Sequence, residues 1–330
     1  MRIRLADVEP SPDVFAAVMA TGVLSIAAGK HHYAEISEFL VSLAAVSLVV
    51  LVALVLLTGA AGHWDLTDPD TSIRLFTFVA ACAVLDSRLT TPRLVVVTLG
   101  VVALLSWLVL IVFTARDMTA RAWPALRDRA HGSWELASVG TSGLVIVITK
   151  IARDTHAHWL LAVAVPVWAA ALCIYGLMTW LILWRAVAQR QDRDGFEPDT
   201  WILMGGLAIA TLAGANIHSL APAWLAGPVR TVTVITWVAA TLWILPLIYF
   251  GLHRISQRPD MLHFAGVWWA FVFPLGMYSA ATYAMATELS QRSLITVSLV
   301  FFWDALAAWL IVVGAGLLRV WRALACKAGT

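Results

Sequence analysis

One carboxylate stands near the middle of an apolar run that is long enough to cross a membrane: Asp304, in SLVFFWDALAAWL. A carboxylate in hydrocarbon costs several kcal/mol unless it is paired, protonated or close to water. Two interpretations follow from this cost. Asp304 either takes up and releases protons, or it hydrogen-bonds to a Thr, Trp or His of a neighbouring helix.

Two further polar patterns resemble sites for metals or cofactors. The acidic stretch DLTDPD at residues 65–70 looks like half of the metal motif of a membrane prenyltransferase, but no second acidic cluster accompanies it, and Pro69 favours a turn. The pairs His31–His32 and His156–His158 flank apolar segments, where histidines at a membrane interface are expected. The sequence therefore predicts no metal, no haem or other cofactor, and no catalytic residues.

Composition identifies the kind of elements that must position these residues. Hydrophobic residues make up 61% of the 330 residues, charged residues 13%, and the mean hydropathy is +0.84; in soluble domains charged residues are about 25%. Because a membrane-spanning helix needs about 20 apolar residues, the chain predicts a single all-α transmembrane domain, 1–330, with ten spans. These lie near 13–30, 38–61, 72–87, 93–115, 134–151, 157–185, 200–219, 229–251, 264–287 and 293–318.

Lys and Arg are unevenly distributed between the two sides of these ten spans. Fifteen of the 22 Lys and Arg residues fall on the side that holds the N-terminus, the even-numbered connections and the C-terminus. Cytoplasmic loops carry the excess of positive charge. The sequence therefore predicts that both termini are cytoplasmic, with the protein in the plasma (inner) membrane.

The spans alternate in character, in a pattern that repeats five times. A short segment rich in Gly, Ala, Ser and Thr is followed each time by a longer one that is almost purely Val, Leu, Ile and Trp. Repeats of this length indicate a repeated structural unit. We expect five helical hairpins in a quasi-fivefold arrangement, near 10–62, 72–115, 134–186, 199–252 and 264–322. The short segments begin near Phe15, Phe76, Leu136, Trp201 and Trp268.

A helix that is apolar on every side belongs in lipid or a deep core, so the even spans are expected to form an outer wall. The odd spans are then inner helices that line a pore; close packing of small residues alone is the alternative. No Lys, Arg, Asp or Glu lies in the middle of an odd span, which disfavours a cation path. An anion is favoured, drawn by Arg88, Lys150 and Arg153 at the outer ends. The expected lining is Thr21, Gly22, Ser25, Thr141, Gly143, Gly206, Thr211, Pro274 and Thr282.

Three motifs resemble those of a known family. They are PSPDVFAAVMATGVLSIA (10–27), FEPDTWILMGGLAIATLAGA (196–215) and WWAFVFPLGMYSAATYA (268–284). The chain resembles the tellurite-resistance/dicarboxylate transporter family, which includes malic acid permeases, sulfite efflux proteins and the slow-type anion channels of guard cells. The resemblance covers essentially the whole chain, and the third motif is the most specific.

The resemblance implies a homotrimer with one pore in each subunit, and a phenylalanine of the ninth helix that plugs the pore. The matching residue is Phe273, with Phe271 as the second choice. An independent physical argument supports the position, because Pro274 removes a backbone hydrogen bond and bends the helix next to this ring. The chain departs from the family in having a mid-helix proline in only one odd span.

The predicted function is an anion channel or facilitator for small anions or C4-dicarboxylates, with membrane lipid and further copies of the chain as its partners and no role for nucleic acid. The alternative is a proton-coupled carrier for malate, sulfite or tellurite-like oxyanions that uses Asp304. An integral membrane enzyme ranks behind both, because it would need paired acidic or His motifs at one depth.

Overall fold

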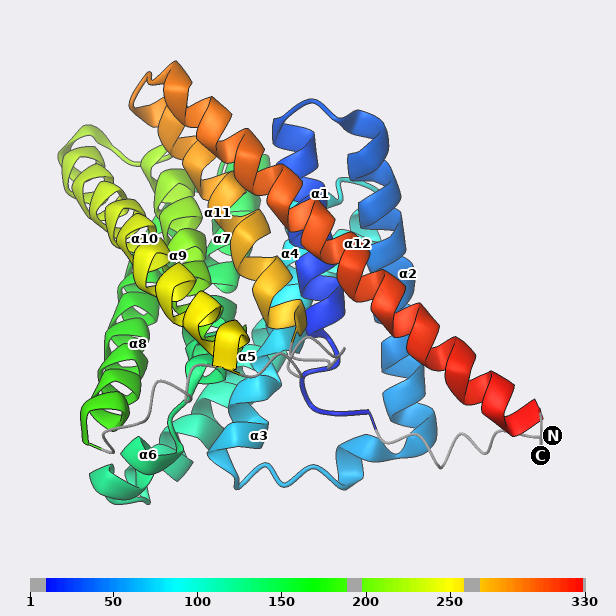
Figure 1. Ribbon diagram of the computed structural model, residues 1–330. Coiled ribbons are helices and arrows are strands. Elements are labelled where there is room, and N and C mark those ends of the chain that lie inside the picture. Colours follow the sequence, from blue (N-terminus) through cyan, green and yellow to red (C-terminus); the bar gives the residue numbers. More distant parts are fainter. Residues whose placement is uncertain (1–9, 189–197, 258–267, 329–330) are drawn as a thin grey trace.

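The computed structural model describes residues 10–188, 198–257 and 268–328, and all regular structure in these ranges is helical. Figure 1 shows long helices that run up and down a bundle, with the short helices α3 and α6 at one end, here called the α3–α6 end. The helices are α1 (Ala16–Lys30), α2 (Ala34–Thr58), α3 (Pro69–Arg74), α4 (Phe76–Arg88), α5 (Arg93–Thr119), α6 (Trp123–Arg129), α7 (Leu136–Thr155), α8 (Leu161–Ala188), α9 (Ile202–His218), α10 (Ala223–Gln257), α11 (Trp269–Glu288) and α12 (Arg292–Ala328). Short 3-10 turns include η3 (Gly132–Glu135) and η6 (Pro198–Trp201).

The starts of the short small-residue helices agree with the sequence. Helices α4 and α7 begin at Phe76 and Leu136 as predicted, and the other three begin one residue later, directly after Phe15, Trp201 and Trp268. Arg2, Arg4, Arg190, Arg193 and Arg258 of the charge count, Phe196 of the second motif, and the start of the fifth hairpin at 264–267 lie outside the described residues.

Helices α3 and α6 were not predicted. A turn does occupy the acidic stretch, since the Asp68 amide donates to the Asp65 carbonyl at 3.1 Å. Pro69, however, opens a helix instead of ending the turn, and a proline likewise occupies the first turn of α6. Proline suits the first helical position because its missing N–H has no partner to lose there.

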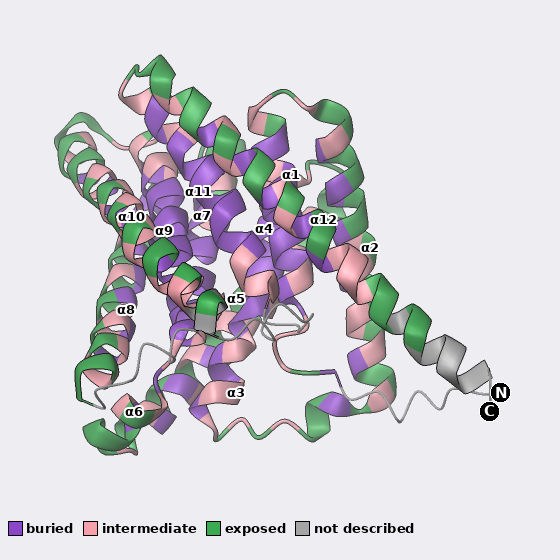
Figure 2. Ribbon diagram, viewed as in Figure 1, coloured by how far each residue is buried: buried purple, intermediate pink, exposed green. Residues whose placement is uncertain are grey.

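Five helices contact one another in a closed order: α1 packs on α4, α4 on α7, α7 on α9, α9 on α11, and α11 on α1. We call these the inner ring, and α2, α5, α8, α10 and α12 the outer helices. Each outer helix packs against the inner helix that precedes it along the chain. Figure 2 shows the difference in burial, with the inner ring mostly buried and the outer helices largely exposed.

Length and apolar character make seven of the described helices able to cross a membrane: all five outer helices, and the segments Gly132–Thr155 and Pro198–His218. Helix α1 is apolar but has only 15 residues, and α4 has 13. Short helices are tolerated at membrane depth where protein surrounds them. The protein is thus an all-helical, multi-pass membrane protein.

The inner helices meet one another at glycines. A Cβ atom placed on Gly22 of α1 would lie 2.6 Å from Val84 of α4, and one on Gly140 of α7 would lie 2.8 Å from Phe76 of α4. At Gly276 of α11 it would lie 3.2 Å from a side chain of α1. Glycine lets helix backbones approach closely, so the small residues of these segments hold the ring together.

The outer helices meet the ring through hydrogen bonds from tryptophan. In four places an indole N–H donates to the inner helix that comes next along the chain or, for α12, to α1. The bonds run from Trp107 of α5 to Thr141 (2.9 Å), from Trp168 of α8 to the Ala210 carbonyl (2.9 Å), from Trp237 of α10 to Thr282 (3.1 Å) and from Trp309 of α12 to Thr21 (2.9 Å). Each outer helix of these four therefore ties two inner helices together.

Candidate functional site

Phe273 lies within the inner ring. Its side chain is fully buried on α11, and its ring edge lies 3.0 Å from the position that a Cβ atom on Gly205 of α9 would occupy. Pro274 is inside the same helix and packs on the same glycine. The two residues therefore occupy the contact between α9 and α11, where the missing side chain of Gly205 leaves room for an aromatic ring.

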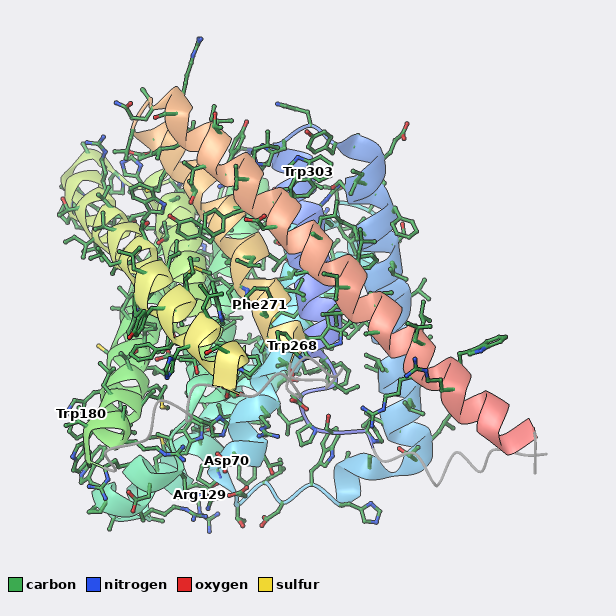
Figure 3. All side chains as sticks on the ribbon, in the orientation of Figure 1. Asp70, Arg129, Trp180, Trp268, Phe271 and Trp303 are labelled. Atoms are coloured by element: carbon green, nitrogen blue, oxygen red, sulfur yellow. The ribbon has the colours of Figure 1, made fainter. Side chains whose placement is uncertain are left out.

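Phe271 has a different environment, at the N-terminal end of α11. Its ring makes edge contacts with Trp201 at 4.8 Å and Trp268 at 6.3 Å between centroids. Figure 3 shows Phe271 and Trp268 near this end of α11. Phe271 thus belongs to an aromatic cluster at the helix end, while Phe273 lies two residues further along α11 and is fully buried.

The four threonines expected to line a path have their hydroxyls turned toward the outer helices. Each donates to the carbonyl four residues earlier or meets an outer-helix side chain: Thr21, Thr141 and Thr282 accept from tryptophans, and Thr211 pairs with Thr236 of α10 at 2.9 Å. In this conformation these hydroxyls are hydrogen-bonded within the protein and do not point toward a solute in the ring. The composition of the inner helices is as predicted, but the direction of these polar groups is not.

Two serines of the inner ring behave differently. The hydroxyl oxygens of Ser25 on α1 and Ser142 on α7 are buried and have no hydrogen-bond partner among the residues that the structure describes. Buried polar groups are rarely left without partners. Of the remaining expected lining residues, Gly22 and Gly143 pack against α4, and Gly206 faces Tyr175 of α8.

Asp304 is exposed on the outer helix α12 and takes part in none of the hydrogen bonds or ion pairs found among the described residues. The hydrogen bond to a Thr, Trp or His that the sequence allowed is therefore not formed within this chain. A role of Asp304 in proton coupling stays a prediction.

A charged cluster closes the α3–α6 end. His131 lies between two carboxylates, with Nδ1 at 2.9 Å from Asp199 and Nε2 at 3.3 Å from Asp70. These bonds raise the pKa of His131 to about 9 despite its burial, so the imidazole is charged near neutral pH. Burial opposes ionisation of Asp70, but bonds from His131, Trp134 and Arg129 hold its pKa well below the usual range.

The same cluster joins separate elements of the fold. Asp199 of η6 accepts from both the amide and the hydroxyl of Ser133 in η3, at 3.0 and 2.9 Å. Gly132 must be a glycine here, because a Cβ atom would lie 2.3 Å from the Asp199 carbonyl oxygen. The N-terminal ends of α7 and α9 are therefore held to each other and to α3.

Glu135, the residue before α7, is a second buried acid. It is fully buried; one carboxyl oxygen accepts from Thr179 of α8 at 2.7 Å, and the other, Oε2, has no hydrogen-bond partner in the described part of the chain. Glu135, His131 and Asp199 were missed in the sequence because they lie just before apolar segments and look like flanking polar residues. The sequence signal that could have identified Glu135 is its position in HGSWEL, one residue before the predicted start of a helix.

Two of the three cations expected to attract anions at the opposite end make close contacts within the protein. Arg88 pairs with Glu38 at 2.7 Å, and Lys150 donates to the Leu89 carbonyl at 2.7 Å at the end of α4. Arg153 donates to the Ser219 hydroxyl at 3.2 Å. Capping of a helix C-terminus by a cation, as Lys150 does at the end of α4, is a stabilising arrangement, and Arg88 joins the end of α4 to Ser37 and Glu38 of α2.

Several known membrane proteins are similar to this chain in sequence. The chain is 32% identical over 118 residues to an uncharacterized membrane protein of Mycobacterium tuberculosis, covering 34% of this chain and 60% of that protein. It is 22% identical over 188 residues to an uncharacterized transporter of Methanocaldococcus jannaschii (56% and 54%), and 24% identical over 160 residues to a second one (47% and 46%). The matches thus span about half of these relatives' length.

A match to a described family covers far more of the chain. Residues 10–317 fit the family described as voltage-dependent anion channel, SLAC1, and this range holds the whole inner ring and all of the outer helices except the last part of α12. The resemblance inferred from the three motifs is thereby confirmed. The chain belongs to the SLAC1 family of voltage-dependent anion channels.

Proposed function

We propose that this protein is an anion channel or facilitator in which Phe273 is the gate. The observation that carries the proposal is the position of Phe273: a fully buried aromatic ring inside the closed inner ring, beside Pro274 and against Gly205. A small rotation of one side chain at such a point opens or blocks a narrow route. No chemistry on the solute is required, only replacement of its hydration, so we expect no enzymatic activity.

The path runs through the centre of the inner ring, in a quasi-fivefold arrangement of five hairpins. Ser25 and Ser142 support this route, since their buried hydroxyls have no protein partner and are free to meet a passing anion. The threonines contribute indirectly, by holding the outer helices. Family membership favours an anion as the substrate, and we infer small inorganic anions or C4-dicarboxylates.

The protein is proposed to act in the plasma membrane as a homotrimer, with both termini in the cytoplasm. The bias of Lys and Arg supports this orientation, and it puts the α3–α6 end on the cytoplasmic side. The trimer is supported by the family resemblance alone.

The gate is tested by substituting alanine at Phe273. In proteoliposomes loaded with chloride, nitrate, malate or sulfite, we expect Phe273→Ala to raise the flux of the permeant anion at least about tenfold, equivalent to a barrier lowered by about 1.4 kcal/mol. The matched control is Phe271→Ala, which removes a ring from the aromatic cluster and leaves flux near that of the wild type. Equal or lower flux in Phe273→Ala would reject Phe273 as the gate.

The second candidate is a proton-coupled carrier for malate, sulfite or tellurite-like oxyanions. The exposed position of Asp304 on α12 gives it no support from that residue. The same vesicles separate the two functions, since a carrier responds to an imposed pH gradient at constant anion gradient and a channel does not. Loss of a gradient response in Asp304→Asn would favour the carrier.

A further inference from the structure

Glu135 has an unusual environment for an acidic residue. Its carboxyl group is buried between η3, α8 and α9, where Thr179 supplies its one hydrogen bond. The free oxygen, Oε2, is 3.8 Å from the position that a Cβ atom on Gly206 would occupy. An ionised carboxylate buried with an unpartnered oxygen is far more costly than the neutral acid.

The neighbours of Glu135 do not supply a compensating charge. On the elements packed against η3, the charged or titratable groups at this end of the molecule are Asp70 and Arg74 of α3, Asp199 of η6, and Tyr175 and Arg185 of α8. Asp70 and Asp199 are bound to His131, Tyr175 donates to the Leu203 carbonyl, and Arg185 to the Ala130 carbonyl. Among the contacts of the described residues, none of these groups pairs with Glu135.

Glu135 and Phe273 contact consecutive residues of α9. Gly206 faces Glu135 and Tyr175, whereas Gly205, the residue before it, faces Phe273 and Pro274. Consecutive helix residues point about 100° apart, so only the part of an α9 turn formed by Gly205 and Gly206, two residues without side chains, separates the acid from the aromatic ring. A movement of this turn toward or away from α8 therefore changes the space available to Phe273.

We propose that Glu135 is a proton-binding site whose ionisation moves the Gly205–Gly206 turn of α9 and thereby opens the passage at Phe273. The part that concerns the gate rests on the proposed function; proton binding itself does not. With the proton bound, the acid is neutral and α8, α9 and η3 pack as observed. Release of the proton to water leaves a carboxylate that needs water or donors around Oε2.

Room for such water exists only if the packing loosens. The Tyr175 ring is 3.2 Å from the Cβ position of Gly206, so the gap between α8 and α9 is filled. Hydration of the carboxylate requires α9 to separate from α8 or η3 at this turn. We therefore expect anion flux to increase with pH and to be lowest when Glu135 is protonated.

The first experiment measures proton binding without transport. Infrared difference spectra of the full-length protein in lipid, recorded between about pH 5 and about pH 9, report the carbonyl band of a protonated carboxylic acid. We expect the wild type to lose one such band as the pH rises, and Glu135→Gln to lack it. A difference spectrum unchanged by Glu135→Gln would overturn the proposal.

The second experiment measures chloride flux from proteoliposomes of phosphatidylcholine and phosphatidylglycerol, with equal pH on both sides. Wild-type flux is expected to rise roughly tenfold over this range, the change that one proton linked to a shift of about one pKa unit produces. Glu135→Gln, which mimics the neutral acid, should stay at the low level at every pH. A wild-type pH profile in Glu135→Gln contradicts the link to the gate.

Three comparisons make the result specific. Asp304→Asn is the matched removal of an exposed carboxylate and should keep the wild-type profile, and Thr179→Val, which removes the one hydrogen bond, should shift it. Phe273→Ala combined with Glu135→Gln should conduct as Phe273→Ala alone. If no variant passes any anion, the proposed function fails, while the infrared band still decides whether Glu135 binds a proton.

Discussion

The contacts within the inner ring and the contacts between the ring and the outer helices are built in opposite ways. Inner helices approach through glycines, as at Gly22 and Gly140, with a neighbouring side chain filling the space of the missing Cβ. Outer helices attach through indole hydrogen bonds to hydroxyls or a carbonyl, as at Trp237 and Trp309. Shape therefore specifies the ring, and directional polar bonds specify how the outer wall is placed around it.

The difference matters for a protein that must change shape. Glycine contacts contain no bond that has to break, so neighbouring inner helices can slide or tilt at little cost. The indole bonds act as fixed points, because a buried donor or acceptor that loses its partner is penalised. We infer that motion is concentrated at the glycine contacts, including the Gly205–Phe273 contact, while the outer helices stay in place.

The largest expected effect comes from filling a glycine contact. Gly140→Val would drive a side chain into Phe76, whose Cδ1 is 2.8 Å from the Cβ position, and overpacking of this kind costs roughly 3 kcal/mol. Denaturant unfolding of the purified protein in detergent measures the loss. The control is Gly176→Val on α8, where nothing lies within 4 Å. Equal losses at the two positions would show that glycine contacts do not specify the ring.

A smaller loss of stability is expected when a residue is removed from the charged cluster at the α3–α6 end, where the hydrogen-bonded partners are ionic. His131→Ala leaves Asp70 and Asp199 without their shared cation, and we expect a loss of roughly 2 kcal/mol near neutral pH, as for hydrogen bonds to charged groups. The pKa of His131 is raised from 6.5 to about 9 in the folded protein. Its stabilisation is therefore complete below about pH 6.5 and is lost as the pH rises through about 9.

Thermal unfolding across this range checks the prediction. Wild-type stability should fall on the alkaline side, whereas His131→Ala should be less stable at neutral pH and show a smaller alkaline fall. His63→Ala is the matched control, because His63 is exposed at the end of α2 and bonds only to the Gly59 carbonyl. An unchanged alkaline fall in His131→Ala would assign that transition to another group.

The smallest effect is expected for a single indole bond. Trp237→Phe removes the donor to Thr282 and keeps most of the packing, so we expect a loss of about 0.6 kcal/mol, typical of side-chain hydrogen bonds in membrane proteins. Thr282→Val removes the acceptor. In a double-mutant cycle the two losses should fail to add by about the same amount. Trp224→Phe, at an exposed site on α10, is the control, and additive losses would show that the bond contributes nothing.

Much of the fold could be predicted from the sequence because it depends on composition along the chain. The change from small to oily residues located the starts of the inner helices, including those at Phe76 and Leu136, within a residue. Composition does not predict how each helix is rotated about its axis. Whether Thr141 points inward or toward α5 depends on Trp107, 34 positions away, and composition has no information on that pairing.

The candidate site could be predicted only in part from the sequence. Phe273 was identified through its motif and the adjacent proline, and its gating role is still a prediction. Glu135 and Asp199 were missed because a polar residue before an apolar segment is usually solvated, and only the tertiary packing of η3 and η6 buries them. Asp304 drew attention for the opposite reason, as an acid inside a span that turned out to be exposed on an outer helix.

The bond from Trp309 to Thr21 joins residues 288 positions apart, and this has a consequence for biosynthesis. Helix α1 leaves the ribosome before the other helices described here, whereas two of its neighbours, α11 and α12, follow all the rest of them. Until then one side of α1 has no protein partner, although Thr21 can already donate to the Ala17 carbonyl of its own helix. Completion of the ring is therefore a late event that the whole chain must await, and truncation after α10 should leave an open, unstable arc.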